Sequence, residues 1–151
     1  MSTSSFIPTA KINDICFFSS DFFKSLEYFQ QVFGFKVKRA QPDSIHPTYI
    51  EFEFSGTTIT MWNRNNVISD AIPERFLGTS GNHNFMIAIK LDTPEQVTET
   101  FNRLKDRGAK VACEPKDFHF GSRACYLLDY EDNIWEIFAW FEGNGPGLLN
   151  Q

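Results

Sequence analysis

Residues 33–37 read FGFKV and residues 107–111 read RGAKV, so a glycine stands at the same place in two related stretches. The two glycines lie 74 positions apart, and each follows a segment with helical periodicity. Apolar runs at residues 12–19 and 84–91 precede the helical segments, and paired strand-like runs follow them. This succession predicts a duplicated βαββ unit, since one copy alone could not bury its sheet face.

The first predicted helix spans residues 22–33. Four apolar residues recur with helical spacing and share one face: Phe22, Leu26, Phe29 and Phe33. Ser20 or Asp21 suits the N-cap position before this helix. Gly34 is expected to end the helix in the left-handed conformation.

The second predicted helix begins at Pro94. Thr93 is suited to the N-cap, Pro94 to the first helical position, and Gln96 to the third, which together form a capping box. Its apolar stripe consists of Val97, Phe101 and Leu104. Gly108 then ends the helix.

Alternation of apolar and polar residues predicts one hairpin in each copy. The first hairpin comprises residues 49–54 and 57–63, with a Ser-Gly turn between them. The second comprises residues 122–128 and 133–140. We therefore expect an α+β fold in which two βαββ modules form a concave mixed sheet.

One domain is expected at residues 11–141, because 151 residues suit a single core. The expected parts of the chain are a flexible arm (1–10), module one (11–63), a linker (64–82), module two (83–141) and a flexible tail (142–151).

Composition excludes several classes of function. A formal charge of −5 argues against a nucleic-acid binder, which would present a basic face. No apolar run reaches the roughly 18 residues of a membrane span, so no membrane partner is expected. The first residues lack the pattern of a signal peptide, and three cysteines are an odd number, so we expect a reduced, cytoplasmic protein.

Strand alternation divides the predicted strands between a helix-facing side and a concave side. The expected concave side chains are Asp14, Cys16, Phe18, Tyr49, Glu51, Glu53, Thr58, Thr60, Trp62, Asn84, Met86, Ala88, Arg123, Cys125, Leu127, Ile134, Glu136 and Phe138. Such a mixture of aromatic and charged groups suits an aromatic or amphipathic small molecule. The alternative is that these aromatic side chains simply fill a core.

Two stretches resemble the signatures of the vicinal oxygen chelate superfamily, which includes glyoxalase I, bleomycin-resistance proteins, fosfomycin-resistance transferases and extradiol dioxygenases. Residues 21–29 (DFFKSLEYF) with residues 32–35 (VFGF) are similar to its first signature. Residues 129–136 (DYEDNIWE) are similar to its closing Asp-Pro-Asp-Gly-Asn-x-x-Glu. The resemblance covers residues 11–141 and implies a glyoxalase-like fold.

The resemblance also implies four metal-ligand positions, on the first, fourth, fifth and eighth strands. In this sequence they are Asp14, Thr60, Met86 and Glu136, and only Glu136 keeps the expected type of ligand. A thioether and a hydroxyl are poor ligands for the metals of this superfamily. We therefore expect no cofactor, and the alternative is a divalent metal such as Zn, Ni, Fe or Mn.

None of the three histidines falls on a predicted concave position. His83 lies three residues before Met86, so strand alternation places it on the side opposite to Met86. His46 and His119 lie in loops. Surface or packing roles are the ordinary explanation for such histidines. A loop histidine such as His119 could instead close over the cavity and act as a metal ligand or general base.

The first functional hypothesis is a metal-independent binding protein of the bleomycin-resistance kind, and the chain is expected to form a homodimer. An aromatic small molecule would be held between Phe18, Trp62 and Phe138. Arg123 would pair with an anionic group of the ligand or with Glu51.

Two rival hypotheses stand beside it. One is a divalent-metal-dependent lyase, isomerase or dioxygenase that uses Glu136, Asp14 and a loop histidine, with Glu136 and His119 as candidate catalytic residues. The other is a degenerate scaffold that acts through its dimer surface.

Overall fold

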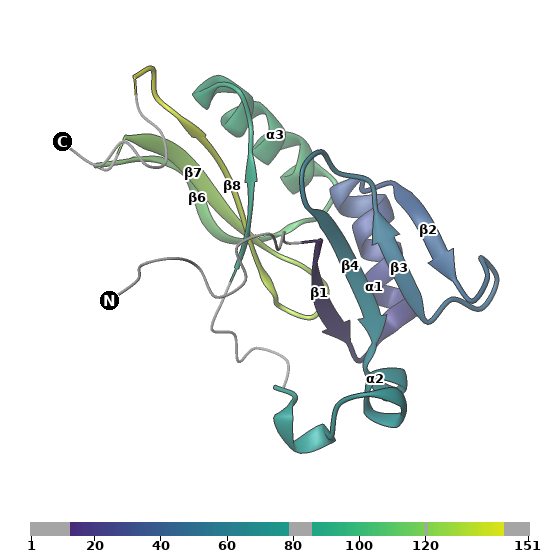
Figure 1. Cartoon of the computed structure of the whole chain (residues 1–151). Coiled ribbons are helices and arrows are strands. Elements are labelled where there is room, and N and C mark those ends of the chain that lie inside the picture. The colour runs from purple at the N-terminus through teal and green to yellow at the C-terminus, as the bar shows by residue number, and fades with distance from the viewer. Residues whose placement is uncertain (1–12, 79–85, 120, 144–151) are drawn as a thin grey trace, which may run out of the picture.

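The protein is described here by a computed structural model covering residues 13–78, 86–119 and 121–143. Two four-stranded mixed sheets dominate it, each with a helix packed against one face (Figure 1). The strand order is β1–β4–β3–β2 in the first sheet and β5–β8–β7–β6 in the second. The two modules therefore share one topology, and the predicted repeat and α+β fold class are confirmed.

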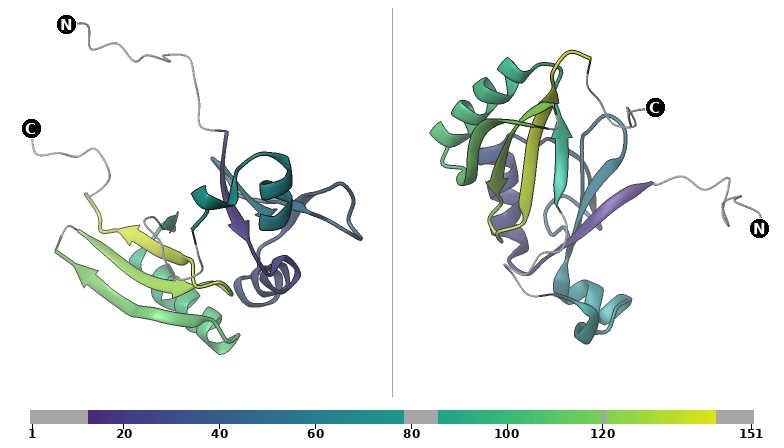
Figure 2. Two further views of the ribbon diagram at one scale, coloured as in Figure 1. Left: turned by 90° about the horizontal axis from the view of Figure 1, so that it is seen from below. Right: turned by 90° about the vertical axis from the view of Figure 1, so that its left-hand side faces the viewer.

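Module one contains β1 (Asp14–Ser19), α1 (Phe22–Tyr28) continued by a π-helical turn (Phe29–Phe33), β2 (Val37–Gln41), β3 (Tyr49–Phe52) and β4 (Thr58–Asn63). Module two contains β5 (Ile87–Lys90), α3 (Pro94–Asp106), β6 (Lys110–Phe118), β7 (Ser122–Leu128) and β8 (Ile134–Trp140). In the right-hand view of Figure 2, α1 and α3 lie on the same side of the molecule. Each sheet therefore has one face against its helix and one open face.

The ends of the helices follow the sequence signals closely. Gly34 and Gly108 have φ values of 74° and 92°, the left-handed conformation that glycine adopts without strain. The predicted capping box of α3 is present: the Thr93 side chain accepts a hydrogen bond from the Gln96 N–H, and the Gln96 side chain accepts one from the Thr93 N–H.

The structure adds elements that the sequence patterns did not reveal. Each module has a further strand, β2 or β6, between its helix and the predicted hairpin. The segment predicted as a linker contains a short helix, α2 (Arg64–Asp70), and a 3-10 turn, Glu74–Phe76. The predicted arm and most of the predicted tail lie outside the described residues. Among the described helices, none has the length and apolar character needed to cross a membrane.

The N-cap of α1 is made by the other module. The Asp21 side chain forms no capping bond. Instead, Glu131 Oε1, in the β7–β8 loop, accepts hydrogen bonds of 2.7 Å from the backbone N–H groups of both Ser20 and Asp21. A carboxylate at this end also interacts favourably with the helix dipole.

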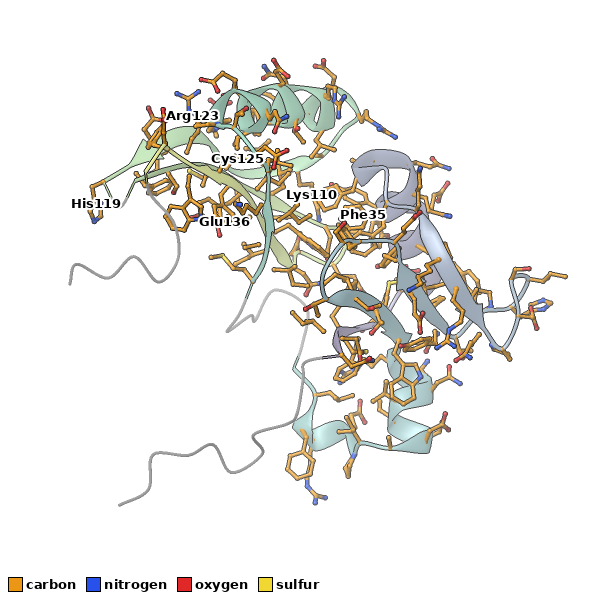
Figure 3. All side chains as sticks on the ribbon, turned by 45° about the horizontal axis from the view of Figure 1, so that its top comes forward. Phe35, Lys110, His119, Arg123, Cys125 and Glu136 are labelled. Atoms are coloured by element: carbon orange, nitrogen blue, oxygen red, sulfur yellow. The ribbon has the colours of Figure 1, made fainter. Side chains whose placement is uncertain are left out.

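A tryptophan of module two completes the core of module one. Trp135 on β8 is 1% exposed, and its ring packs against four phenylalanines of module one at centroid distances of 5.3 to 6.0 Å. These are Phe17, Phe29, Phe33 and Phe35. Several phenylalanine side chains therefore pack at the junction between the two modules. Figure 3 labels Phe35 and Lys110 in this region.

The buried carboxylate of Asp129 holds this tryptophan in place. Asp129 Oδ2 accepts hydrogen bonds from Trp135 Nε1 (3.0 Å) and Asn133 Nδ2 (2.8 Å). Asp129 Oδ1 accepts from the backbone N–H groups of Glu131 and Asn133. Burial raises the pKa of the Asp129 carboxyl even though these four donors oppose the shift.

Replacing Asp129 with Asn is expected to lower the free energy of unfolding by about 2 kcal/mol. Whichever way the amide is turned, its NH2 group would face two N–H donors. Asn is neutral, so the free-energy cost of burying a charged carboxylate disappears in the variant. The hydrogen-bond acceptor that the second carboxylate oxygen provided is still lost. Urea denaturation of the full chain measures the change.

Asp132→Asn is the matched control in the same loop. Asp132 forms a half-exposed ion pair with Lys110, so its loss should cost less than about 1 kcal/mol. Asn also tolerates the φ of 65° found at this position. Equal losses of stability in the two variants would contradict the anchoring role of Asp129.

Candidate functional site

The open face of sheet one carries a buried polar pair. Asp14 Oδ2 accepts a hydrogen bond of 3.2 Å from Thr60 Oγ1, and Asp14 Oδ1 accepts one of 3.0 Å from Asn13 Nδ2. Thr60 is fully buried, whereas Asp14 is partly exposed. The structure thus brings together two of the four positions implied for a metal, but their oxygens already bind one another.

Aromatic side chains flank this pair. Tyr49 lies opposite Trp62 in the β3–β4 ladder, and their rings are 6.4 Å apart and nearly perpendicular. Phe18, on β1, is in register with Trp62 on the other side. The three predicted aromatic residues of module one are therefore neighbours on one open face.

A pocket of about 430 Å³ opens on the same face. Its lining is mostly polar and consists of Asn13, Asp14, Lys38, Arg39, Tyr49, Glu51, Thr58 and Thr60. Glu51 forms an ion pair with Arg39 on β2, so its partner is Arg39 rather than the predicted Arg123.

The cysteine on this face is not a poised nucleophile. Burial raises the pKa of the Cys16 thiol, and the nearby Asp14 carboxylate raises it further. Burial also raises the pKa of Cys125, to about 12. Both sulfurs therefore stay protonated at neutral pH, which favours a structural role.

The open face of sheet two centres on Glu136. The Tyr126 hydroxyl, opposite it in the β7–β8 ladder, donates a hydrogen bond of 2.8 Å to Glu136 Oε1. Burial and this bond raise the pKa of Tyr126 to about 12, so the hydroxyl keeps its proton. Tyr126 was not among the predicted site residues.

The outer strand of this sheet places exposed side chains beside Glu136. Ala88 on β5 pairs with Glu136 in register, and Lys90 pairs with Phe138. Ala88 and Lys90 are exposed, and Met86 is 45% exposed. The predicted residues Met86, Glu136 and Phe138 therefore come from adjoining strands of one sheet.

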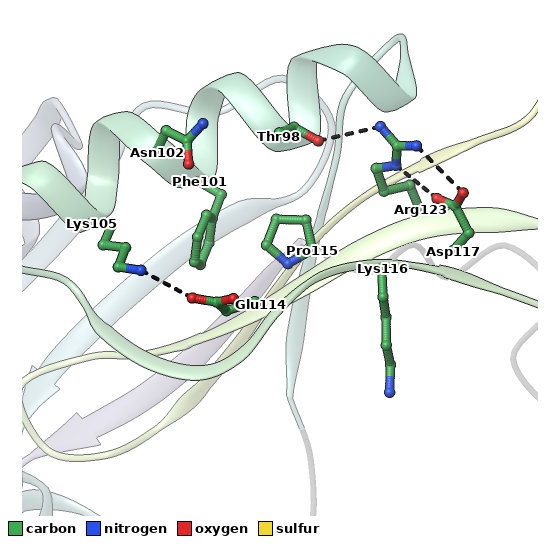
Figure 4. A pocket seen from close by; sticks show the side chains of 9 residues that line it. All are labelled: Thr98, Phe101, Asn102, Lys105, Glu114, Pro115, Lys116, Asp117 and Arg123. Atoms are coloured by element: carbon green, nitrogen blue, oxygen red, sulfur yellow. Dashed lines mark hydrogen bonds and ion pairs between the residues drawn. The ribbon is translucent and has the colours of Figure 1, made fainter.

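The predicted orientation of β7 is wrong by one residue. Arg123 Nη1 donates to Thr98 Oγ1 of α3 at 3.3 Å, and Arg123 also pairs with Asp117, so it lies on the helix side of the sheet (Figure 4). Cys125 and Leu127 belong to the buried cluster against α3, and Figure 3 shows Cys125 and Glu136 on opposite sides.

The cause of this error is the composition of β7, where both alternating sets contain apolar residues. The register of the β7–β8 hairpin distinguishes the two faces of β7. The Asp129 N–H bonds to the Asn133 carbonyl, which fixes Leu127 opposite the core residue Trp135 and Tyr126 opposite Glu136. Pairing back from Trp135 would have identified Tyr126.

His119 lies far along the sheet from Glu136. It is exposed in the β6–β7 turn next to Phe118, which pairs with Ser122 (Figure 3). Four residues of β7 separate Ser122 from Tyr126, which is roughly 13 Å along a strand. This position does not bring His119 to Glu136.

The four positions implied for a metal occupy corresponding places in the two modules. On β1, Asp14 lies two residues before Cys16, the register partner of Thr60. On β5, the residue paired with Glu136 is Ala88, and Met86 lies two residues before it. The positions in the two modules therefore correspond. Asp14 is bonded to Thr60, and Glu136 is bonded to a tyrosine. Across the described part of the chain, no three His, Cys, Asp or Glu residues are grouped to hold a metal ion. These donors do not fit a transition metal.

Comparison with known proteins identifies the family. The model of the Glyoxalase/Bleomycin resistance protein/Dioxygenase superfamily matches residues 11–137. No curated protein sequence matched the chain. A glyoxalase/bleomycin resistance protein/dioxygenase from Nocardioides is similar in structure, with 25% identity, a TM-score of 0.76, and coverage of 91% of this chain and 88% of that one.

Two more distant structures share the fold. A family enzyme from Burkholderia phytofirmans PsJN has 22% identity and a TM-score of 0.71, covering 87% of this chain and 100% of that chain. A lactoylglutathione lyase from Agrobacterium tumefaciens has 14% identity and a TM-score of 0.67, covering 87% and 95%. The chain therefore belongs to the Glyoxalase/Bleomycin resistance protein/Dioxygenase superfamily.

Proposed function

On the premise of this family membership, we propose that the chain binds a small aromatic or amphipathic molecule on its open sheet faces without a metal ion. The observation that carries the proposal is the polar pocket of about 430 Å³ on module one, with Tyr49 in its lining and Trp62 beside that ring. A polar pocket with an aromatic edge suits an amphipathic molecule, whose ring can contact the aromatic side chains while its polar groups contact the rest of the lining.

The chemistry of the family's metal positions supports the metal-free part of the proposal. Asp14 and Glu136 each already accept a hydrogen bond from a neutral hydroxyl group. Met86 offers a thioether, which is a soft ligand. Organic ligands with hydrogen-bond donors suit such carboxylates better than a divalent cation does.

We also propose that the protein is a cytoplasmic homodimer. The three cysteines are free, as a reducing compartment requires. Light scattering of the full chain should give twice the monomer mass of 17.4 kDa. A mass of one chain at micromolar concentration would refute the dimer.

Aromatic ligands are expected to quench the tryptophan fluorescence of the protein, and Trp62→Ala should weaken their binding about tenfold or more. The reason is that Trp62 supplies the aromatic wall and is one of the three tryptophans that emit. A fluorescence titration with a panel of substituted benzenes and naphthalenes measures both effects.

Phe23→Ala is the control for this experiment, because Phe23 is 57% exposed on α1, which packs against the other face of sheet one. Its removal should leave ligand binding unchanged. The proposal fails if no member of the panel binds, or if both variants respond alike.

Metal analysis of the purified protein directly tests the rival hypothesis of a metal-dependent enzyme. We expect less than one-tenth of an equivalent of Zn, Ni, Fe or Mn per chain, roughly the level of weak surface binding. Glu136→Gln is expected to leave that content unchanged. Stoichiometric metal that this variant loses would overturn the metal-free proposal in favour of a metal-dependent lyase or dioxygenase.

A further inference from the structure

The strip of open surface along β5 differs from the rest of sheet two because, within the described residues, its exposed side chains form no hydrogen bond or ion pair. β5 is the outer strand of its sheet. Ala88 and Lys90 are exposed on it, and within the described residues Lys90 makes no ion pair. Met86 stands on the same face, two residues before Ala88. This strip therefore presents exposed side chains and, among the described residues, an unpaired cation.

Glu136 presents an acceptor to this space. Its Oε1 is occupied by the Tyr126 hydroxyl, whereas its Oε2 accepts no hydrogen bond from the part of the chain that the structure describes. The hydrogen bond from the Tyr126 hydroxyl to Oε1 fixes the orientation of the carboxylate. A ligand over Ala88 would meet that second oxygen directly, because Ala88 is in register with Glu136.

The spacing of charges along the strip is defined. Lys90 lies two residues beyond Ala88, and its register partner is Phe138. Two residues of a strand span about 7 Å. Glu136 is on the neighbouring strand, so its Cα lies diagonally from that of Lys90 at about 8 Å. A ring with a donor at one end and an anionic group at the other can therefore reach both side chains, with the Phe138 ring and the Met86 thioether as apolar neighbours.

Resting on the proposed function, we propose that the face formed by Met86, Ala88, Lys90, Glu136 and Phe138 binds an aromatic acid that carries a hydrogen-bond donor. The amine or hydroxyl of the ligand donates to Glu136 Oε2, and its anionic group pairs with Lys90. The ring lies over Ala88. A carboxylate that would hold a metal in relatives instead selects an organic donor here.

Calorimetric titration of the full chain tests this assignment with three probes: 4-aminobenzoate, benzoate and aniline. 4-Aminobenzoate has both groups, and each of the others lacks one. It is expected to bind about tenfold more tightly than either. Lys90→Met and Glu136→Gln should each remove most of that advantage, and Ala88→Leu should abolish binding by filling the space.

Lys116→Met is the matched control. Lys116 is also an exposed lysine on this face, but it lies on β6, three strands away from β5, at roughly 14 Å. Ala88 is exposed, so its substitution should leave the thermal midpoint unchanged and keep the test valid.

The outcomes separate the two proposals. Binding of aromatic probes that depends on Trp62 but not on Lys90, Glu136 or Ala88 overturns this assignment alone. An equal effect of Lys116→Met and Lys90→Met also overturns it, because the charge would then act without a defined site. Failure of every aromatic probe to bind overturns both this assignment and the proposed function.

Discussion

The packing of Trp135 among the phenylalanines of module one is the constraint on which the rest of the structure depends. Its ring crosses from one repeat into the core of the other, and its N–H is held by the buried Asp129 carboxylate. The same loop provides Glu131, which caps α1. Tyr28 adds a further link, since its hydroxyl donates to the Leu128 carbonyl and accepts from the Lys110 N–H. The two modules are thus joined through their helix sides and connecting loops.

Joining the modules in this way leaves the open faces free to differ. In a strand, alternate residues point to opposite faces, so a substitution on one face need not disturb the core on the other. The core positions Phe17 and Trp135 alternate with Cys16 and Glu136 along their strands. The two modules consequently keep one strand order and one register while carrying different chemistry on their open faces.

The sequence predicts the repeat and the helix ends because these depend on local rules. Gly34 and Gly108 adopt left-handed angles, and Thr93 caps its helix, as their residue types require. The orientation of β7 could not be obtained in the same way, since neither of its faces is purely polar. It is fixed by long-range pairing with β8. The cap at Asp21 likewise comes from a residue about 110 positions away, which no local pattern indicates.

The two acidic groups at the family's metal positions illustrate how divergence on an open face can redirect a site. Asp14 accepts hydrogen bonds from Thr60 and Asn13, with the Arg39–Glu51 ion pair nearby. Among the described residues, Glu136 accepts a hydrogen bond from one neutral tyrosine, so more of its acceptor capacity remains available. A divalent cation would need both carboxylates and further donors, whereas an organic donor needs only one oriented oxygen. On the metal-free proposal, Thr60 and Met86 leave a metal short of suitable donors, whereas a single oriented carboxylate oxygen still suffices for a hydrogen-bonded organic ligand.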